Sequence, residues 1–377
     1  MKKVKVCFIM TDAISFQMLC RAQFEYMQNN SNFEMTFISG GKQADFDKLA
    51  RRKVGRIFDA KLFRKPSLVN DIKSLVLLIS YFSTHKFDLV IYSTPKALLL
   101  GSLSAFITKQ DRTIAVVQGR AYENFTGKKR IFYEFLDKFS FLLSHRVLFV
   151  SESLASAYLK EKIVNPKKSH VVSYGSYNGV DINRFNLKEK IGITEDRQKP
   201  FTVIIAGRIC PDKGLYDLGE IIKHINVSNI SFKLVGPIED VESDVFLKKL
   251  MSKYSNVEYI PYTDNIEIFF KIADLHLFLT HREGFGNVAI EAAACGIPTF
   301  AYDVIGVKNS VEEGVSGKKF SFQDFKTIAN AIEQAANDPD FNSKYPNARA
   351  WAIENFEQKK VWKNYLNFYN SVMNTNS

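Results

Sequence analysis

Short apolar runs alternate with longer amphipathic segments along most of this chain. Strands are expected at residues 4–9, 33–38, 54–58, 89–92, 113–117, 147–150, 170–173, 202–206, 231–235, 257–260, 275–279 and 298–301. Helices are expected near 14–28, 67–84, 96–108, 129–144, 152–161, 214–226, 241–254, 264–271 and 287–295. Strands that alternate with helices form right-handed βαβ units, so we expect an α/β protein with parallel sheets.

The alternation is interrupted at residues 176–200 by a stretch rich in Gly, Asn, Asp and charged residues that ends in Pro200. Because 377 residues exceed what one hydrophobic core usually supports, this stretch is interpreted as a linker. We predict two doubly wound Rossmann-like domains, 1–175 and 201–377, that face each other across a cleft. The end of the chain contains helical stretches without an expected strand, and whether these pack back on the N-terminal domain stays open.

Positive charge is concentrated in the first half of the chain. The net charge is +11, but residues 1–180 contain 28 basic and 14 acidic residues (+14), and the remaining residues contain 23 and 26 (−3). An excess of basic residues indicates an anionic partner, which can be a nucleic acid, a membrane surface or a phosphorylated ligand.

Several protein classes do not fit the sequence. The four cysteines lie far apart, which argues against a disulfide scaffold or a cysteine-rich zinc site. The N-terminal apolar run is short and is interrupted by Asp12, so it is interpreted as a first strand rather than a signal peptide. Apolar runs of about 18 residues are missing, and a cytoplasmic or membrane-attached protein is expected.

Two loops that follow expected strands contain residues suited to binding a phosphorylated ligand. The first reads GRICPDKG, residues 207–214, and brings Arg208 and Lys213 to a helix start, where the helix end adds partial positive charge. Gly207 allows a tight turn at the end of the strand. This combination suits a diphosphate, although a solvated pair of charges would give the same pattern.

The second loop reads THREGFGNVAIEAAACGIP, residues 280–298. Glycines at a helix start let backbone N–H groups approach an anion closely. Glu291 lies one helical turn beyond Asn287, on the same face. An acidic residue near a helix start usually caps the helix dipole, but this explains Glu283 poorly and does not explain Glu291.

These segments resemble the signatures of the family-4 retaining glycosyltransferases, which have the two-Rossmann GT-B fold, in particular the bacterial enzymes of surface-polysaccharide synthesis. The segment from Arg282 onward resembles one signature of that family, and GRICPDKG resembles another. The stretch NGVDINRF, residues 178–185, resembles the family's domain junction, and FVSESLASAYL, residues 149–159, resembles the segment before it. The resemblance is specific over about residues 145–320 and weaker before them.

The resemblance implies a role for each residue of the two loops. Gly207, Arg208 and Lys213 would hold the diphosphate of a nucleotide-sugar, and the backbone near Phe285, Gly286 and Asn287 would meet the same phosphates and the sugar. Glu291 would accept hydrogen bonds from the ribose hydroxyls. Glu283 would contact the donor sugar near the reacting carbon as the catalytic residue.

The activity implied is transfer of a hexose or N-acetylhexosamine, from a donor expected to be UDP-linked, with retention of configuration. The acceptor would be a saccharide, expected on a lipid diphosphate. Neither a cofactor nor a metal is expected, because two cations and a helix end can neutralise the leaving diphosphate. The Asp-x-Asp strings at 45–47 and 338–340 are interpreted as ordinary polar segments. A nucleotide-sugar epimerase of the same fold and a non-catalytic sugar-nucleotide-binding module remain alternatives.

The first half departs from the family pattern. Many members have a glycine pair after the first strand, where this chain has Asp12 and Ser15 within TDAISF, and many have a His-Gly where it has Gln118 followed by Gly119. A glutamine can bind a sugar hydroxyl but cannot act as a general base. Asp12, Ser15, Gln118 and Glu123 are therefore candidates for contacts with the acceptor or the donor sugar.

Residues 127–146 and 48–65 combine basic and aromatic side chains. This composition suits an anionic membrane surface, and a peripheral position on the inner face of the cell membrane is expected. An ordinary amphipathic helix with a solvated face remains the alternative. Nucleic acid is not expected as a partner, since no nucleic-acid-binding motif accompanies the charge.

Overall fold

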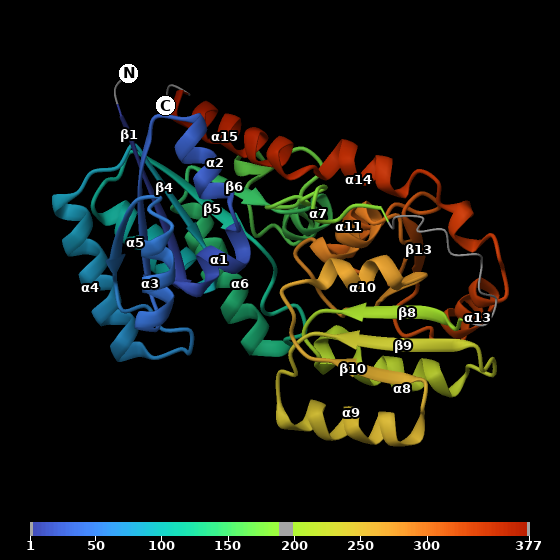
Figure 1. The fold of residues 1–377 in the computed structure, drawn as a ribbon. Helices are drawn as coiled ribbons and strands as arrows, with labels where there is room; N and C mark the ends of the chain where they lie inside the picture. The colour runs from blue at the N-terminus through green and yellow to red at the C-terminus, as the bar shows by residue number, and fades with distance from the viewer. Residues whose placement is uncertain (1–2, 188–198, 375–377) are drawn as a thin grey trace. The chain divides into compact units, whose positions relative to one another are not determined.

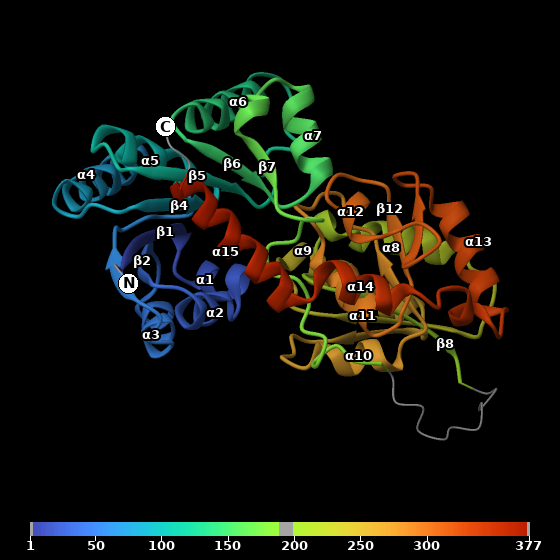
Figure 2. The ribbon, with the colours of Figure 1, turned by 90° about the horizontal axis from the view of Figure 1, so that it is seen from above.

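The computed structural model describes residues 3–187 and 199–374, and the chain divides into two compact units (Figures 1 and 2). Unit 1 comprises Met1–Asn178 and Lys359–Ser377, and unit 2 comprises Gly179–Gln358. The chain therefore passes from one unit to the other twice. Part of the expected linker, residues 188–198, lies outside the described residues.

Unit 1 is built on a parallel sheet whose described strands have the order β3-β2-β1-β4-β5-β6-β7. Its strands are β1 (Val4–Asp12), β2 (Phe33–Gly40), β3 (Arg56–Asp59), β4 (Leu89–Ser93), β5 (Arg112–Val117), β6 (Arg146–Phe149) and β7 (Ser169–Val171). Residues 89–93, which form β4, are buried on both sides, as the continuous apolar runs of a covered parallel sheet predict.

Helices cover both faces of this sheet. The helices of unit 1 are α1 (Ile14–Cys20), α2 (Gln23–Asn30), α3 (Gln43–Arg51), α4 (Leu68–Thr84), α5 (Pro95–Ile107), α6 (Gly127–Leu142), α7 (Glu152–Lys160) and α15 (Gln358–Asn374), with a short 3-10 turn at Pro166–Lys168. Helices α4, α5 and α6 lie side by side on one face, and α1, α2 and α3 lie on the other (Figure 2). The single helix expected at 14–28 is two helices, because Arg21 has a φ of 40° and ends α1.

The C-terminal helix α15 belongs to the core of unit 1. Its Tyr369 packs against Phe8 of β1 (ring centroids 6.4 Å apart), and the Tyr369 and Tyr177 hydroxyls are hydrogen-bonded at 3.1 Å. Trp362 contacts Tyr26 of α2. The last described helix therefore covers the same sheet as the first helices of the chain.

Unit 2 has a second parallel sheet, with the strand order β10-β9-β8-β11-β12-β13 among the described residues. Its strands are β8 (Phe201–Ala206), β9 (Ile230–Val235), β10 (Val257–Ile260), β11 (Leu275–Phe278), β12 (Thr299–Tyr302) and β13 (Gly317–Phe320). Strand β13 was not expected, because its sequence GKKF carries two lysines. It becomes a strand by pairing with β12.

The helices of unit 2 also form two layers. They are α8 (Leu215–Lys223), α9 (Val241–Lys253), α10 (Ile266–Ile272), α11 (Asn287–Ala294), α12 (Val307–Ser310), α13 (Phe325–Ala336) and α14 (Ala348–Phe356), with 3-10 turns at Pro211–Lys213 and Phe341–Lys344. Apolar side chains of α8, α9 and α13 pack on one face of the sheet in a single buried cluster. On the other face α11 packs against β11 and β12, and α14 packs against α11.

Both sheets have the doubly wound arrangement that the sequence predicted. The strand order reverses between β1 and β4 in unit 1, and between β8 and β11 in unit 2. Loops diverge where the order reverses, so a crevice at the carboxyl ends of these strands is the usual ligand site of such sheets. No described helix combines the length and apolarity needed to cross a bilayer. Within the described residues, no three His, Cys, Asp or Glu side chains gather in a way that could hold a metal ion.

Candidate active site

The two loops singled out in the sequence follow the two strands at which the order of the unit 2 sheet reverses. Strand β8 leads into the loop 207–214, and β11 leads into residues 279–286 before α11. The loops are bonded to each other. The His281 N–H donates to the Asp212 carbonyl (2.9 Å), and the Arg282 Nε donates to the Asp212 Oδ2 (3.0 Å). The 207–214 and 280–287 segments therefore form one site.

Lys213 and Glu283 are in direct contact in this site. The Lys213 Nζ forms an ion pair with the Glu283 Oε1 and also donates to the Thr280 Oγ1 (3.3 Å). The Lys213 and Glu283 side chains are 21% and 22% exposed, so the pair is partly screened by solvent and open to a ligand. The cation expected on the diphosphate and the carboxylate expected on the sugar thus face each other.

Arg208 also has an acidic partner. Its guanidinium forms an ion pair with Glu239, which follows β9, and both side chains are about half exposed. Such an exposed pair contributes little to stability, about 0–1 kcal/mol, and can exchange readily for another anion. Cys210 lies in the same loop, and burial together with the nearby Glu239 raises its pKa to about 11, so its thiol stays protonated at neutral pH.

Glycines occupy the N-caps of both helices that start at the site. Gly214 precedes α8 with a φ of 81°, and a Cβ there would lie 2.4 Å from the Leu279 carbonyl oxygen. Gly286 precedes α11 with a φ of 87°, and a Cβ there would lie 2.8 Å from the Phe278 ring. A Cβ would be strained at both positions, so both require glycine, and the two helices start at the two loops.

The remaining predicted donor residues lie on or beside α11. Asn287 is its first residue, and Glu291 follows one turn later with only 5% of its surface exposed. The Phe285 side chain is 4% exposed and packs against Phe356 (ring centroids 5.2 Å apart). Phe285 can therefore offer a ligand only its backbone. Gly207, which has a φ of 141°, is the first residue after β8.

Asp217 is a site residue that sequence reasoning missed. It is 5% exposed on α8, and its Oδ2 accepts hydrogen bonds from the His281 Nε2 (2.7 Å) and the Tyr302 hydroxyl (2.9 Å). Burial and the adjacent Asp217 charge raise the pKa of Tyr302. The three groups bind the β11 loop to α8 and β12. These residues lie far apart in the sequence, so no local motif contains them. The one clue in the sequence is that an aspartate stands on the apolar face of the helix expected at 214–226.

Of the four residues of unit 1 expected to contact the acceptor or the donor sugar, two lie at the carboxyl ends of strands. Asp12 ends β1, and its Oδ1 accepts from the Ile14 N–H (3.3 Å). Gln118 follows β5, and its Nε2 donates to the Ser93 Oγ at the end of β4 (3.0 Å). Ser15 lies within α1, and Glu123 forms an ion pair with Arg120 (3.0 Å). Asp12 and Gln118 are therefore the two that lie directly at strand ends.

Thr94 marks the point where the strand order of unit 1 reverses. It has a φ of 78°, which is rare for a β-branched residue and costs on the order of 1–3 kcal/mol. Its Oγ1 accepts from the Thr11 N–H (3.0 Å) and lies 2.7 Å from the Thr11 Oγ1, which joins the ends of β1 and β4. Backbone strain of this kind clusters at functional sites, and no sequence pattern at Thr94 indicated it.

Two family models match the chain and together span most of it. "Glycosyltransferase Family 4" matches residues 26–184, and "Glycosyl transferases group 1" matches residues 187–352. The chain is a family-4 glycosyltransferase of the GT-B fold. The predicted enzyme class and fold are thereby confirmed.

Three curated or solved relatives of this glycosyltransferase cover 80% or more of its length. It is 29% identical to the capsular polysaccharide biosynthesis glycosyltransferase CapM of Staphylococcus aureus, over 99% of this chain and 98% of that protein. It is 25% identical to the UDP-Gal:alpha-D-GlcNAc-diphosphoundecaprenol alpha-1,3-galactosyltransferase of Escherichia coli, over 80% of each. The crystal structure of Anabaena Alr3699/HepE with UDP superposes with a TM-score of 0.79 at 19% identity, covering 98% of this chain and 100% of that one.

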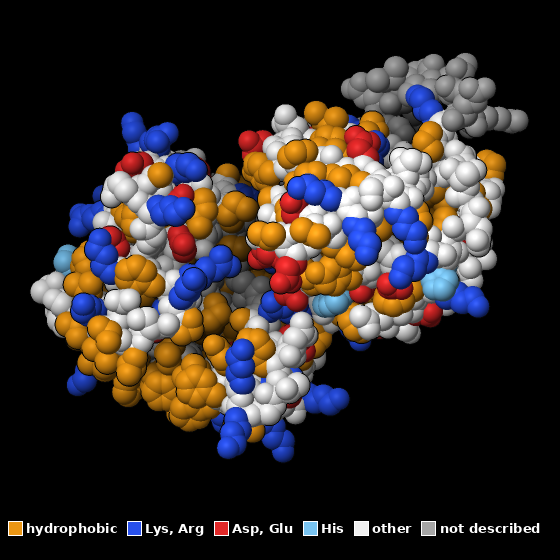
Figure 3. All heavy atoms as spheres, turned by 90° about the horizontal axis from the view of Figure 1, so that it is seen from below, with side chains coloured by type: hydrophobic (Ala, Val, Ile, Leu, Met, Phe, Trp, Pro, Cys, Tyr) orange, Lys and Arg blue, Asp and Glu red, His pale blue; other side chains and the backbone are white. Residues whose placement is uncertain are grey.

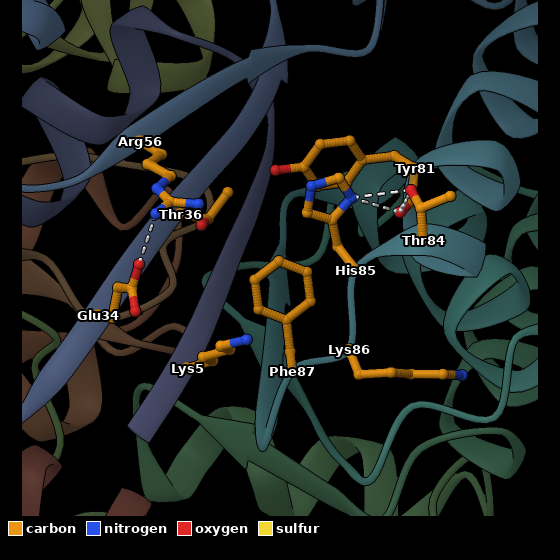
Figure 4. Close-up of a pocket in the computed structure, with 9 residues that line it drawn as sticks. All are labelled: Lys5, Glu34, Thr36, Arg56, Tyr81, Thr84, His85, Lys86 and Phe87. Carbon is orange, nitrogen blue, oxygen red and sulfur yellow. Dashed lines mark hydrogen bonds and ion pairs between the residues drawn. The ribbon is translucent and has the colours of Figure 1, made fainter. Parts of the chain in front are cut away.

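A separate pocket of about 90 Å³ lies in unit 1 of the glycosyltransferase (Figure 4). Its lining includes Lys5, Glu34 and Arg56 from the first residues of β1, β2 and β3, and the stacked rings of Tyr81 and His85 (centroids 4.2 Å apart). These are the amino ends of the strands. The pocket is therefore at the opposite edge of the sheet from Asp12 and Gln118.

Proposed function

We propose that this glycosyltransferase moves a hexose or N-acetylhexosamine from a UDP-sugar to a saccharide carried on a lipid diphosphate, in the synthesis of capsule or another cell-surface polysaccharide. The similarity to CapM and to the galactosyltransferase acting on a diphosphoundecaprenol-linked sugar supports the pathway and the acceptor. The HepE complex with UDP supports the nucleotide. The observation that carries the proposal is the Lys213–Glu283 pair between the two loops of unit 2.

The donor would bind by exchange of ion-pair partners. Its diphosphate replaces Glu283 as the partner of Lys213 and replaces Glu239 as the partner of Arg208, and the start of α11 faces the same phosphates. Glu283 is then released to accept hydrogen bonds from the sugar hydroxyls. Glu291, on the inner face of α11, accepts from the ribose.

Transfer would need no metal, because the charge that grows on the departing UDP is met by two cations and a helix N-terminus fixed in advance. Retention of configuration follows if the acceptor attacks from the face that UDP leaves. The glycosidic bond to phosphate breaks as the new one forms, and the leaving phosphate oxygen takes the acceptor proton. The Asp-x-Asp strings give no alternative metal site in this proposal, since 45–47 lies on α3 and 338–340 follows α13.

The acceptor would be held by unit 1, with Asp12 and Gln118 at the strand ends as its polar contacts. An acceptor on a lipid diphosphate implies a peripheral position on the inner face of the cell membrane.

Glu283→Gln separates this proposal from its alternatives. We expect UDP-sugar binding to persist and transfer to fall by about 10²–10³-fold, since a carboxylate aimed at the reacting sugar is lost. Glu220→Gln is the matched control, because Glu220 forms an ion pair with Lys223 on the exposed side of α8. Turnover without any acceptor would identify an epimerase, and binding without transfer by the wild type would identify a binding module.

Two further measurements test the mechanism. Activity that persists in EDTA supports metal-free transfer, whereas loss that Mg²⁺ or Mn²⁺ restores contradicts it. NMR of the product's anomeric proton distinguishes retention from inversion, and an inverted product would refute the front-face mechanism.

A further inference from the structure

One side of unit 1 exposes apolar side chains in a regular pattern. On α4 exposed apolar residues recur every four positions, and on α6 residues 131, 135 and 142 are four and seven positions apart with 132 beside them, so each set lies on one side of its helix. The stripes consist of Leu68, Ile72 and Val76 on α4, and of Ile131, Phe132, Phe135 and Leu142 on α6, each more than half exposed. Single exposed apolar residues are ordinary, but contiguous ones mark an interaction surface.

Helix α5 lies between α4 and α6, which places the two stripes on the same layer of unit 1 (Figure 2). The end of α5 adds Phe106 and Ile107, which are also exposed. Figure 3 shows hydrophobic side chains gathered on one side of this unit, at the lower left, with Lys and Arg around them. We call the exposed residues of these three helices the α4–α6 surface.

Basic side chains border the α4–α6 surface, and its acidic residues are already engaged. Arg64 and Lys65 precede α4, Lys73 lies on it, and Lys128 and Lys129 start α6, all exposed. The acidic residues of α4 and α6 are each held by a partner: Asp71 by Lys96, Glu134 by Arg130, and Asp137 by the Tyr122 and Tyr158 hydroxyls. The surface therefore presents uncompensated positive charge beside apolar side chains.

Of the basic residues within 48–65, the structure places only some on the α4–α6 surface. Within residues 48–65, Arg52 is bound to Glu25 and Arg56 to Glu34 at the start of β2, so neither belongs to this surface. Arg64 and Lys65 do belong to it, because they lie beside the start of α4.

The charged end of the α4–α6 surface lies near the edge where the acceptor is expected. In a parallel α/β sheet the helices run antiparallel to the strands, so the first residues of α4 and α6 lie at the carboxyl edge. Lys128 and Lys129 are therefore on the same edge of unit 1 as Asp12 and Gln118.

We propose that the α4–α6 surface docks unit 1 on an anionic lipid bilayer. Its phenylalanine, isoleucine, leucine and valine side chains enter the boundary between headgroups and acyl chains, and its lysines and arginines meet lipid phosphates. The proposal rests on the proposed function in one respect, because it brings a lipid-linked acceptor to the carboxyl edge of the sheet. The binding to lipid itself does not depend on the identity of the donor.

Co-sedimentation with vesicles tests the surface. The full chain is mixed at low salt with vesicles of phosphatidylcholine, either pure or containing about 30% phosphatidylglycerol. The wild type is expected to bind the anionic vesicles. The triple variant Ile72→Ser/Phe132→Ser/Phe135→Ser should lose about tenfold or more in affinity. The double variant Lys128→Ser/Lys129→Ser should lose about 25-fold, at about fivefold per basic residue. Val241→Ser/Val245→Ser on α9, which replaces equally exposed residues of unit 2, should bind like the wild type.

Three outcomes would overturn the proposal: wild type that does not bind anionic vesicles, a triple variant that binds them like the wild type, or a control that loses binding as strongly as the triple variant. Light scattering identifies a different occupant, because a wild-type dimer that the triple variant converts to monomer, with vesicle binding unchanged, would assign the surface to a second copy of the chain. Thermal stabilisation by UDP is measured on every variant. Variants that keep UDP stabilisation but lose vesicle binding support the surface, whereas vesicle binding without UDP stabilisation of the wild type would refute the donor assignment and leave the surface standing.

Discussion

Lys213→Met should weaken UDP binding by about 10–150-fold. A charge-assisted hydrogen bond from the ammonium to a phosphate oxygen contributes about 1.5–3 kcal/mol, which corresponds to that range of dissociation constants. A unit charge 4 Å from the ammonium gains about 4 kcal/mol at an effective dielectric constant of 20, and the partly exposed pair with Glu283 that must be given up offsets about 1 kcal/mol of it. The hydrogen-bond estimate and the Coulomb estimate therefore agree on a loss of up to about 3 kcal/mol. The variant also leaves Glu283 without its cation, which adds repulsion toward the diphosphate.

Isothermal titration of UDP into the full chain measures this effect. Lys223→Met is the matched control, because Lys223 also forms an ion pair with a glutamate in unit 2, but does so on the exposed side of α8 with 51% of its side chain exposed. Its UDP affinity should stay within about twofold of wild type. The reasoning is refuted if Lys213→Met binds UDP as the wild type does, or if the control loses as much affinity.

Two other changes probe how unit 2 is held together. Gly214→Ala should lower the free energy of unfolding by about 3 kcal/mol or more, because the new Cβ meets backbone atoms at a positive φ. Gly314→Ala should lower it by only about 1–2 kcal/mol, because Gly314 has a φ of 72° but open space around the Cβ position. Urea unfolding followed by circular dichroism measures both losses, and equal losses would contradict the steric argument. Burial lowers the pKa of His276 to about 3 in the folded chain, whereas a histidine in the unfolded chain has a pKa of about 6.5. Below about pH 6.5 the unfolded chain therefore binds a proton that the folded chain does not, and the free energy of unfolding falls by about 2 kcal/mol between pH 8 and pH 5. Hydrogen exchange of the β11 amides should show this loss in the wild type but not in His276→Gln, and identical pH profiles would exclude His276 as its source.

Most strands could be predicted because both sheets are parallel and covered on both faces. Their strands are then continuous apolar runs, which stand out from the amphipathic helices. The elements that were missed lack such a signal. Strand β13 carries two lysines in four residues, and α3 has a short, mostly polar sequence with only Phe46 and Leu49 buried. The break between α1 and α2 occurs at Arg21, where the sequence has no glycine or proline that would predict it.

The meeting of residues 207–214 and 280–287 in one site was predictable, because each segment is short and follows one of two neighbouring strands, β8 and β11. What sequence could not give are contacts between residues far apart in the chain. The ion pair between Lys213 and Glu283 joins residues separated by 70 positions, and Asp217 meets His281 over 64. The strained Thr94 depends on where β4 must turn into α5, which no local pattern encodes.

The position of α15 gives the two units different requirements during synthesis. Unit 2 is one continuous stretch, Gly179–Gln358, so all its residues have been synthesised before the rest of α15 is made. Unit 1 begins first but is completed last, because Tyr369 of α15 covers Phe8 and bonds to Tyr177. The usual order, in which the N-terminal domain folds first, is therefore reversed for the final step. A chain stopped at residue 358 would keep every residue of the loops 207–214 and 280–287, yet its first sheet would lack the helix that closes it.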